Sequence, residues 1–273
     1  MDKIRAAISK ARADRDTLGT PRPRGAKPLP VDAISANWAA LPVERFNATL
    51  MRKNRIVSYA RSPESAGIDM MRTRILQQMH DNNWRRLAIT SPTAGCGKST
   101  VALNLAISLS RQPDLRSMLL ELDLRRPSLA RMLGINPRPV DFTDVLRGNT
   151  DFAQNAACYD GNLAVGLNST KTRNASELLS SAGISDTLAQ LDAAYRPDIT
   201  IFDMPPMLAA DDMMAFATQV DCVLIIAAAE RTTTQQIDIC EQDLARQTNV
   251  MGVVLNECRY MGADAGYEYE YDA

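Results

Sequence analysis

The chain has few of the side chains on which several classes of catalytic and metal site depend. His80 is the single histidine among 273 residues. We therefore expect neither a histidine-based zinc site nor a Ser-His-Asp triad. The five cysteines form no C-x-x-C pair and no even framework, which favours reduced thiols in a cytoplasmic protein. They are Cys96, Cys158, Cys222, Cys240 and Cys258.

Long apolar runs are also lacking. No stretch approaches the 18 residues that a membrane-spanning helix needs. Three aspartates among the first sixteen residues, Asp2, Asp14 and Asp16, are incompatible with the apolar region of a signal peptide. The sequence is therefore expected to be soluble. Its apolar content of 45%, with aromatics at 5%, suits helices packed on a parallel sheet.

Positive charge is concentrated at the front of the chain. Residues 1–61 carry a net charge of +8 and the rest carries −9. Residues 2–16 have the composition of a short charged helix, and residues 17–31, rich in Pro and Gly, are expected to be a linker. A basic arm of this kind either touches an anionic membrane or an acidic partner, or is a solvated tail.

Strand and helix patterns alternate after this arm. An apolar strand at 87–90, a glycine-containing loop, a helix at 99–111 and a strand at 117–123 predict a βαβ unit. We predict an α/β fold of the P-loop NTPase type, with a mostly parallel central sheet flanked by helices on both faces. Further strands are expected at 162–167, 199–203, 222–228 and 251–256, and helices at 63–79, 174–194 and 233–248. The predicted organisation is an arm and linker at 1–55, a nucleotide-binding domain at 56–259 and a tyrosine-rich tail at 260–273.

The loop after the first strand has the composition of a phosphate-binding loop. Glycines at 95 and 97 allow backbone N–H groups to point inward, and the following helix N-terminus favours an anion. Lys98 is expected to reach the phosphates of ATP, while Ser99 and Asp203 are expected to bind Mg²⁺. Pro92 replaces the first glycine of the usual pattern. The candidate nucleotide-binding residues here are Thr93, Ala94, Gly95, Cys96, Gly97, Lys98, Ser99 and Thr100.

Cys96 has two possible roles inside this loop. It is either a small residue that fills the loop or a thiol whose oxidation blocks nucleotide entry.

Five further segments of the chain form a combined pattern. They are LLELDLRRPSL (119–129), DVLRG (144–148), NASELLSS (174–181), FDMPP (202–206) and GYEYEYDA (266–273). The C-terminal segment is notable because four of the seven tyrosines lie in the last fourteen residues. Taken together, these segments resemble the bacterial tyrosine kinases of capsule and exopolysaccharide export, P-loop proteins related to the MinD/ParA group.

This resemblance implies that the protein is a tyrosine autokinase. Mg-ATP held by Lys98 and Ser99 donates its γ-phosphoryl group to tail tyrosines, usually of a neighbouring subunit in a ring, and thereby regulates polysaccharide polymerisation and export. By the same resemblance, Asn256 contacts adenine. The implied phosphoacceptors are Tyr260, Tyr267, Tyr269 and Tyr271.

Two carboxylates are candidates to accept the proton of the tyrosine hydroxyl, because a phenol is mostly protonated at neutral pH. Glu121 stands where the family has an aspartate, and its longer side chain predicts reduced activity. Asp123 is expected to support the metal. Glu121 is otherwise a charged strand end without a catalytic role. Arg125 and Arg126 either pair with phosphate or tail carboxylates or form a solvated basic pair.

The helix before the first strand departs from the family pattern Glu-x-x-Arg-x-x-Arg, which mediates ring assembly. Ala66 and Asp69 occupy the first two positions, and Arg72 alone is retained. A ring through this helix is therefore not expected, although Arg72 and Arg74 are available to bind a neighbour.

The resemblance also implies partners and a location. Without a membrane segment, the chain is expected to be cytoplasmic and to meet the inner membrane through a separate Wzz-type transmembrane co-polymerase. A protein-tyrosine phosphatase is a further expected partner, and nucleic acid is not expected.

Two other functions remain open at this stage. One is a MinD/ParA-like ATPase switch, although Thr93 stands where that group has its signature lysine. The other is a catalytically weak regulator of polysaccharide chain length.

Overall fold

A computed structural model describes residues 30–258 of the chain. Its centre is a seven-stranded sheet with the order β3-β4-β2-β5-β1-β6-β7. Neighbouring strands are parallel except for β3 and β4, which pair antiparallel at one edge. The strands are β1 Arg86–Thr90, β2 Ser117–Glu121, β3 Ala157–Tyr159, β4 Leu163–Gly166, β5 Ile199–Asp203, β6 Cys222–Ala228 and β7 Asn249–Asn256.

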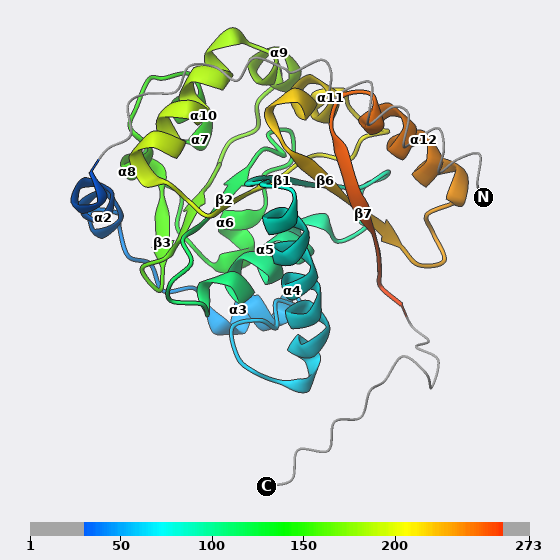
Figure 1. Cartoon of the computed structure of the whole chain (residues 1–273), viewed down its shortest axis with the longest axis horizontal. Helices are drawn as coiled ribbons and strands as arrows, with labels where there is room; N and C mark the ends of the chain where they lie inside the picture. The colour runs from blue at the N-terminus through cyan, green and yellow to red at the C-terminus, as the bar shows by residue number, and fades with distance from the viewer. Residues whose placement is uncertain (1–29, 259–273) are drawn as a thin grey trace, which may run out of the picture.

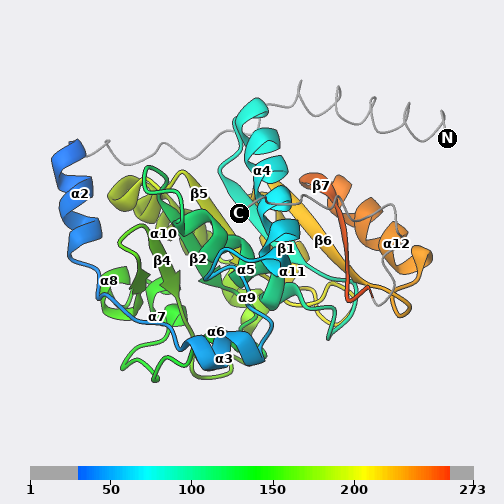
Figure 2. The same ribbon diagram turned by 90° about the horizontal axis from the view of Figure 1, so that it is seen from below.

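Helices cover both faces of this sheet (Figures 1 and 2), so the predicted fold class is confirmed. Two separate apolar cores result, one on each face. One face carries α2 Val31–Ala39, α7 Phe142–Leu146, α8 Phe152–Asn155, α9 Ala175–Leu179, α10 Ala182–Tyr195, α11 Asp212–Phe216 with the 3-10 turn η2 Ala217–Gln219, and α12 Thr234–Ala245. The other carries α3 Ala48–Lys53, η1 Pro63–Ser65, α4 Ala66–Asp81, α5 Lys98–Ser110 and α6 Leu129–Leu133.

The central strands are apolar on both sides because both faces are covered. In β1, Leu87 and Ile89 pack toward α4 and α5, while Ala88 faces the opposite core. This alternation follows from the two-residue period of a strand. β1 lies between β5 and β6 in the sheet. The chain runs from β1 toward one edge of the sheet, to β2, and from β5 toward the other edge, to β6, so the direction of the connections reverses between β5 and β1. Ligands bind at such a reversal point, outside the carboxyl ends of the strands.

Most elements lie where the sequence predicts them. The helix expected at 63–79 is η1 followed by α4, and the one expected at 99–111 is α5. The single helical segment expected at 174–194 is two helices, because Ser180 and Ser181 interrupt it. Strand β3, with three residues, carries too short an apolar pattern to be predicted.

Part of the segment that the sequence assigns to the arm and linker is folded onto the domain. Ile34 and Trp38 of α2 are buried in one core, and Met51 of α3 is buried in the other. The indole N–H of Trp38 donates to the carbonyl of Tyr195 at 2.7 Å, and the two rings pack edge to face. The folded unit therefore begins before residue 56. Residues 1–29, including the helix expected at 2–16, lie outside the described part.

No helix between residues 30 and 258 has both the length and the apolar character needed to cross a bilayer.

The burial of Trp38 leads to a prediction about the free energy of unfolding. We expect Trp38→Ala to lower the free energy of unfolding by about 3–5 kcal/mol, because a buried ring and its hydrogen bond are lost together. Val31→Ala in the same helix is the control, since Val31 is 69% exposed and a surface change costs about 0.5 kcal/mol or less. Urea denaturation measures the free energy of unfolding of both variants. Equally small effects would show that α2 is not part of the cooperative unit.

Candidate nucleotide-binding site

The loop between β1 and α5 has the backbone shape of a phosphate-binding loop. Gly95 and Gly97 both have a φ of +83°, and Gly97 is the left-handed N-cap of α5. A side chain at 97 would also collide with a neighbour, because its Cβ would lie 2.2 Å from the Nδ2 atom of Asn256. Glycine is therefore required at this position for both conformation and space.

Lys98 lies between two carboxylates at the carboxyl ends of two other strands. Its Nζ is 2.6 Å from an Asp123 oxygen and 3.5 Å from an Asp203 oxygen. Burial lowers the pKa of the Lys98 ammonium, but the ion pairs with Asp203 and Asp123 outweigh this and the net shift is upward. Nζ also lies 3.3 Å from the hydroxyl oxygen of Ser99. The structure thus brings together four of the predicted site residues.

Asp203 has spare ligand capacity. It is fully buried, and apart from the 3.5 Å ion pair with Lys98 its carboxylate oxygens make no hydrogen bond of normal geometry within residues 30–258. Burial raises its pKa, and the ammonium of Lys98 lowers it, with a net upward shift. Buried oxygens without hydrogen bonds are uncommon, and a bound cation would satisfy both oxygens of this carboxylate. The oxygens of Asp203, Asp123 and the Ser99 hydroxyl are of the type that Mg²⁺ prefers, and Mg²⁺ usually binds one or two carboxylates together with phosphates.

Glu121 lies at the same edge of the sheet, but its carboxylate is engaged elsewhere. One oxygen accepts the N–H groups of Ser128 and Leu129, at 2.5 and 2.8 Å, and the other accepts that of Asn168 at 2.9 Å. Burial raises the pKa of Glu121 to about 7, against the lowering effect of these N–H groups. Strand β2 ends at Glu121, so Asp123 lies in the following turn rather than on the strand as the sequence suggested.

Two side chains from beyond β1 contact the outside of the phosphate loop. Asn256, at the end of β7, donates to the carbonyl of Cys96 at 2.9 Å. Arg231, in the turn after β6, donates to the carbonyl of Gly95 at 2.8 Å and pairs with Glu257. Arg231 was not predicted. Its place just after a strand end is a signal that could have identified it, because such positions border the ligand crevice.

The thiol of Cys96 is buried against the same turn. It donates to the carbonyl of Thr93 at 3.2 Å and lies 3.7 Å from the hydroxyl of Thr232. Burial raises its pKa, but the contacts with Thr93 and Thr232 outweigh this and the net shift is downward. Its side chain is 1% exposed, which fits the role of a loop-filling residue.

The two arginines expected near phosphate differ in their surroundings. Arg125 forms two parallel hydrogen bonds of 2.8 Å with the carboxylate of Asp212. Arg126 is exposed. The proposed phosphoacceptors Tyr260, Tyr267, Tyr269 and Tyr271 lie outside the described residues.

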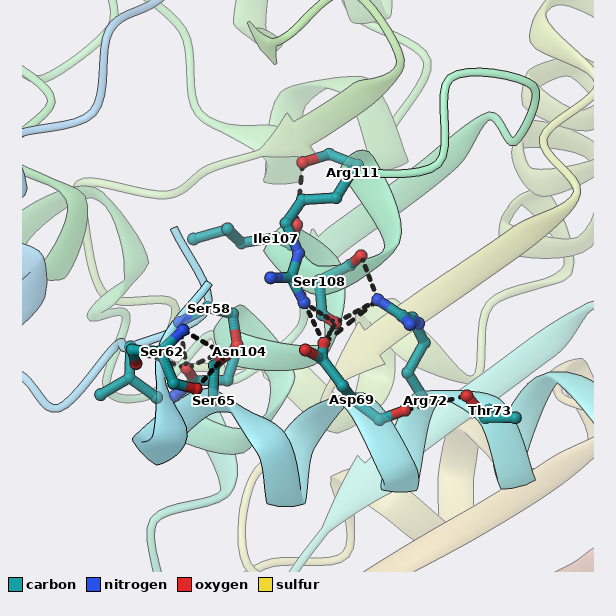
Figure 3. Close-up of polar contacts among 12 residues, drawn as sticks. Ser58, Ser62, Ser65, Asp69, Arg72, Thr73, Asn104, Ile107, Ser108 and Arg111 are labelled. Atoms are coloured by element: carbon teal, nitrogen blue, oxygen red, sulfur yellow. Dashed lines mark hydrogen bonds and ion pairs between the residues drawn. The ribbon is translucent and has the colours of Figure 1, made fainter. Parts of the chain in front are cut away.

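The retained arginine of the family's assembly motif points into its own chain (Figure 3). Arg72 of α4 donates to the carbonyl and hydroxyl of Ser108 in α5, at 3.1 and 2.9 Å, and pairs with Asp69 at 3.1 Å. Asp69 also accepts the Ser108 hydroxyl at 2.6 Å and pairs with Arg111. Arg72 therefore joins α4 to α5.

Known proteins match most of this chain. A family model described as ParA, NUBPL iron-transfer P-loop NTPase, matches residues 83–271. Tyrosine-protein kinase YwqD of Bacillus subtilis is 29% identical over 219 residues, which are 79% of this chain and 91% of YwqD. Tyrosine-protein kinase wzc of Salmonella typhi is 31% identical over 197 residues, which are 68% of this chain but 26% of wzc.

Two solved structures agree with these relatives. The VpsO kinase domain is 28% identical with a TM-score of 0.64, and the match covers 77% of this chain and 100% of that one. The kinase domain of the Escherichia coli tyrosine kinase ETK is 25% identical with a TM-score of 0.64, covering 76% and 80%. The resemblance inferred from the motifs is thus confirmed. The chain belongs to the ParA family of P-loop NTPases, within which it is similar to bacterial tyrosine kinases.

Proposed function

We propose that this protein is an ATP-dependent protein-tyrosine autokinase that regulates capsule or exopolysaccharide polymerisation and export. The observation that carries the proposal is the buried position of Lys98 between Asp123 and Asp203, at the start of a helix that follows a glycine loop. The tyrosine kinases among its relatives support the choice of reaction.

The residues at this edge of the sheet divide into phosphate ligands and metal ligands. The loop N–H groups and Lys98 hold the β- and γ-phosphates of ATP, which lie at the positive end of the α5 dipole. Ser99 and Asp203 would hold Mg²⁺, whose positive charge would offset the negative charge on the transferred phosphoryl group. On nucleotide binding, the Lys98 ammonium would turn from these carboxylates toward the phosphate oxygens, which would leave Asp203 for the metal and Asp123 for the tyrosine hydroxyl.

Asp123 is the carboxylate that we assign to the tyrosine hydroxyl. A phenol with a pKa near 10 needs a base that accepts its proton as the phosphoryl group transfers. Asp123 is 5% exposed and contacts Lys98 directly, and this supports a role for it close to the transferred phosphoryl group. The acceptors are the tail tyrosines Tyr260, Tyr267, Tyr269 and Tyr271, of this or a neighbouring subunit.

Glu121 has a different role in this proposal. Its three backbone hydrogen bonds hold the turn before α6 and the segment after β4 against the end of β2. We assign it the task of fixing the turn that carries Asp123, Arg125 and Arg126. The extra methylene relative to the family's aspartate gives Glu121 the reach for these contacts.

The partners and location follow from the same function. We propose that a transmembrane Wzz-type co-polymerase recruits the chain to the cytoplasmic face of the inner membrane, and that a protein-tyrosine phosphatase reverses the modification. Phosphates added beside the tail carboxylates at 268, 270 and 272 would repel one another and loosen any assembly that packs the tails together.

The kinase proposal predicts the behaviour of a lysine variant. Purified chain incubated with Mg-ATP and the co-polymerase should gain phosphotyrosine in the tail, as mapped by mass spectrometry. Lys98→Met should lower the rate at least about 100-fold, because the charge that holds the phosphates is lost. Lys171→Met, at an exposed position, is the matched control. ATP hydrolysis without phosphotyrosine would favour the ATPase switch, and neither activity would favour the weak regulator.

The raised pKa of Glu121 predicts that the stability of the protein depends on pH. Its pKa of about 7 in the folded chain exceeds its ordinary value of 4.5. Its contribution to stability is therefore full below about pH 4.5 and is lost as the pH rises through about 7. Glu121→Gln does not titrate. We expect the free energy of unfolding of the wild type, minus that of the variant, to fall between about pH 5 and pH 8. Urea denaturation over this range measures it, and a difference that rises with pH would contradict the assignment.

A further inference from the structure

Three successive carbonyl groups of the phosphate loop are bonded on its outer side. The carbonyl of Gly95 accepts from Arg231, that of Cys96 accepts from Asn256, and that of Gly97 accepts the N–H of Val101 inside α5. The third bond is part of the helix and needs no partner from elsewhere. The first two come from side chains 136 and 160 residues away along the chain.

These bonds determine where the loop N–H groups point. The peptide bonds are trans, since the described chain has no cis peptide. In a planar trans peptide the C=O and the following N–H point in opposite directions. Carbonyls held outward at Gly95, Cys96 and Gly97 therefore direct the N–H groups of Cys96, Gly97 and Lys98 to the opposite side. Successive N–H groups in this arrangement form an anion-binding concavity.

The N–H group of Gly97, which directly precedes the helix, is available to a ligand. It donates to no acceptor within residues 30–258. The positive φ angles of Gly95 and Gly97 are the conformations that such an alternation needs. Without a partner on the outer side, these peptide planes are free to rotate and present carbonyl oxygens, which repel phosphate.

Arg231 and Asn256, which bind the outer carbonyls of the loop, are held in place by bonds of their own. The backbone N–H of Ala229 donates to the carbonyl of Asn256 at 2.8 Å, which ties the ends of β6 and β7 together. The N–H of Thr232 closes the following turn onto Ala228 at 2.9 Å. Arg231 is held on its far side by Glu257. The ends of β7 and β6 thus hold the Asn256 amide and the Arg231 guanidinium next to the phosphate loop.

We propose that Arg231 and Asn256 are positioning residues that orient the phosphate-loop peptides toward the β-phosphate of the nucleotide. This rests on the proposed nucleotide-dependent function, and it gives Asn256 a role on the loop backbone in place of the expected contact with adenine. Arg231 then has a function that no motif indicates. The two residues act on the protein, and neither needs to touch the ligand.

The test separates a backbone role from a base contact by using a probe without a base. Wild-type chain and the variants Asn256→Ala, Arg231→Ala and Arg231→Lys are titrated with ADP and with inorganic pyrophosphate, each displacing a fluorescent ADP analogue. We expect the affinities for both probes to fall by the same factor in each alanine variant. The factor is about tenfold for Asn256→Ala, whose bond is partly buried, and about threefold for the exposed Arg231 bond. Arg231→Lys should recover part of the loss.

Two controls make the result interpretable. Arg246→Ala removes an exposed arginine that pairs with Asp243 on α12, and it should leave both affinities unchanged. Thermal unfolding of each variant shows whether the fold is intact, and Arg231, with 54% of its side chain exposed, is a site where alanine should be tolerated.

Three outcomes would overturn the proposal. They are a loss of affinity for ADP without a loss for pyrophosphate, no loss for either probe, and wild-type chain that binds ADP but not pyrophosphate. Failure of the kinase proposal is a different result, in which the chain binds both probes but forms no phosphotyrosine with its partner present.

Discussion

The ion pairs of Lys98 with Asp123 and Asp203 constrain every element around the phosphate loop. An ammonium removed from water is stable only beside close counter-charges. Asp203 reaches it because β5 lies next to β1, and Asp123 because β2 lies next to β5. The strand order is therefore a condition for this charge cluster. Its two carboxylates outnumber its one ammonium, and a divalent cation that arrives with phosphates would balance the excess.

The second constraint acts on the backbone of the same loop. The charge cluster beside the loop carries one carboxylate in excess, so the binding of phosphate depends on hydrogen bonds from the loop and therefore on which way each peptide faces. The ends of β6 and β7 supply Arg231 and Asn256 on the outer side, while β2 and β5 supply the carboxylates on the inner side. Strands on both sides of β1 thus contribute to one site, which explains why the loop lies at the centre of the sheet and not at its edge.

Local patterns predict the parts of this site that are close in sequence. The order of strand, glycine loop and helix indicates Lys98 and Ser99, and the apolar strand before Asp203 indicates its place at a strand end. The outward bonds from Arg231 and Asn256 span more than a hundred residues and depend on the register of β6 and β7, which no local pattern records. Glu121 is predicted to lie near the site, but its bond from Asn168, 47 residues further along the chain, depends on the pairing of β2 with β4. The burial of Trp38 was also missed, because α2 is short and its partner Tyr195 is far along the chain.

The departure at Asp69 changes what helix α4 can do. An aspartate at this position gives Arg72 and Arg111 a shared counter-charge, and Ser108 completes the cluster (Figure 3). If Arg72 turned outward to bind a neighbouring subunit, it would leave the Asp69 carboxylate with one cation fewer and the Ser108 carbonyl without its arginine donor. Both losses cost free energy in a partly buried site. Association through α4 would therefore favour side chains that are already exposed on this helix, among them Met70, Thr73 and Arg74.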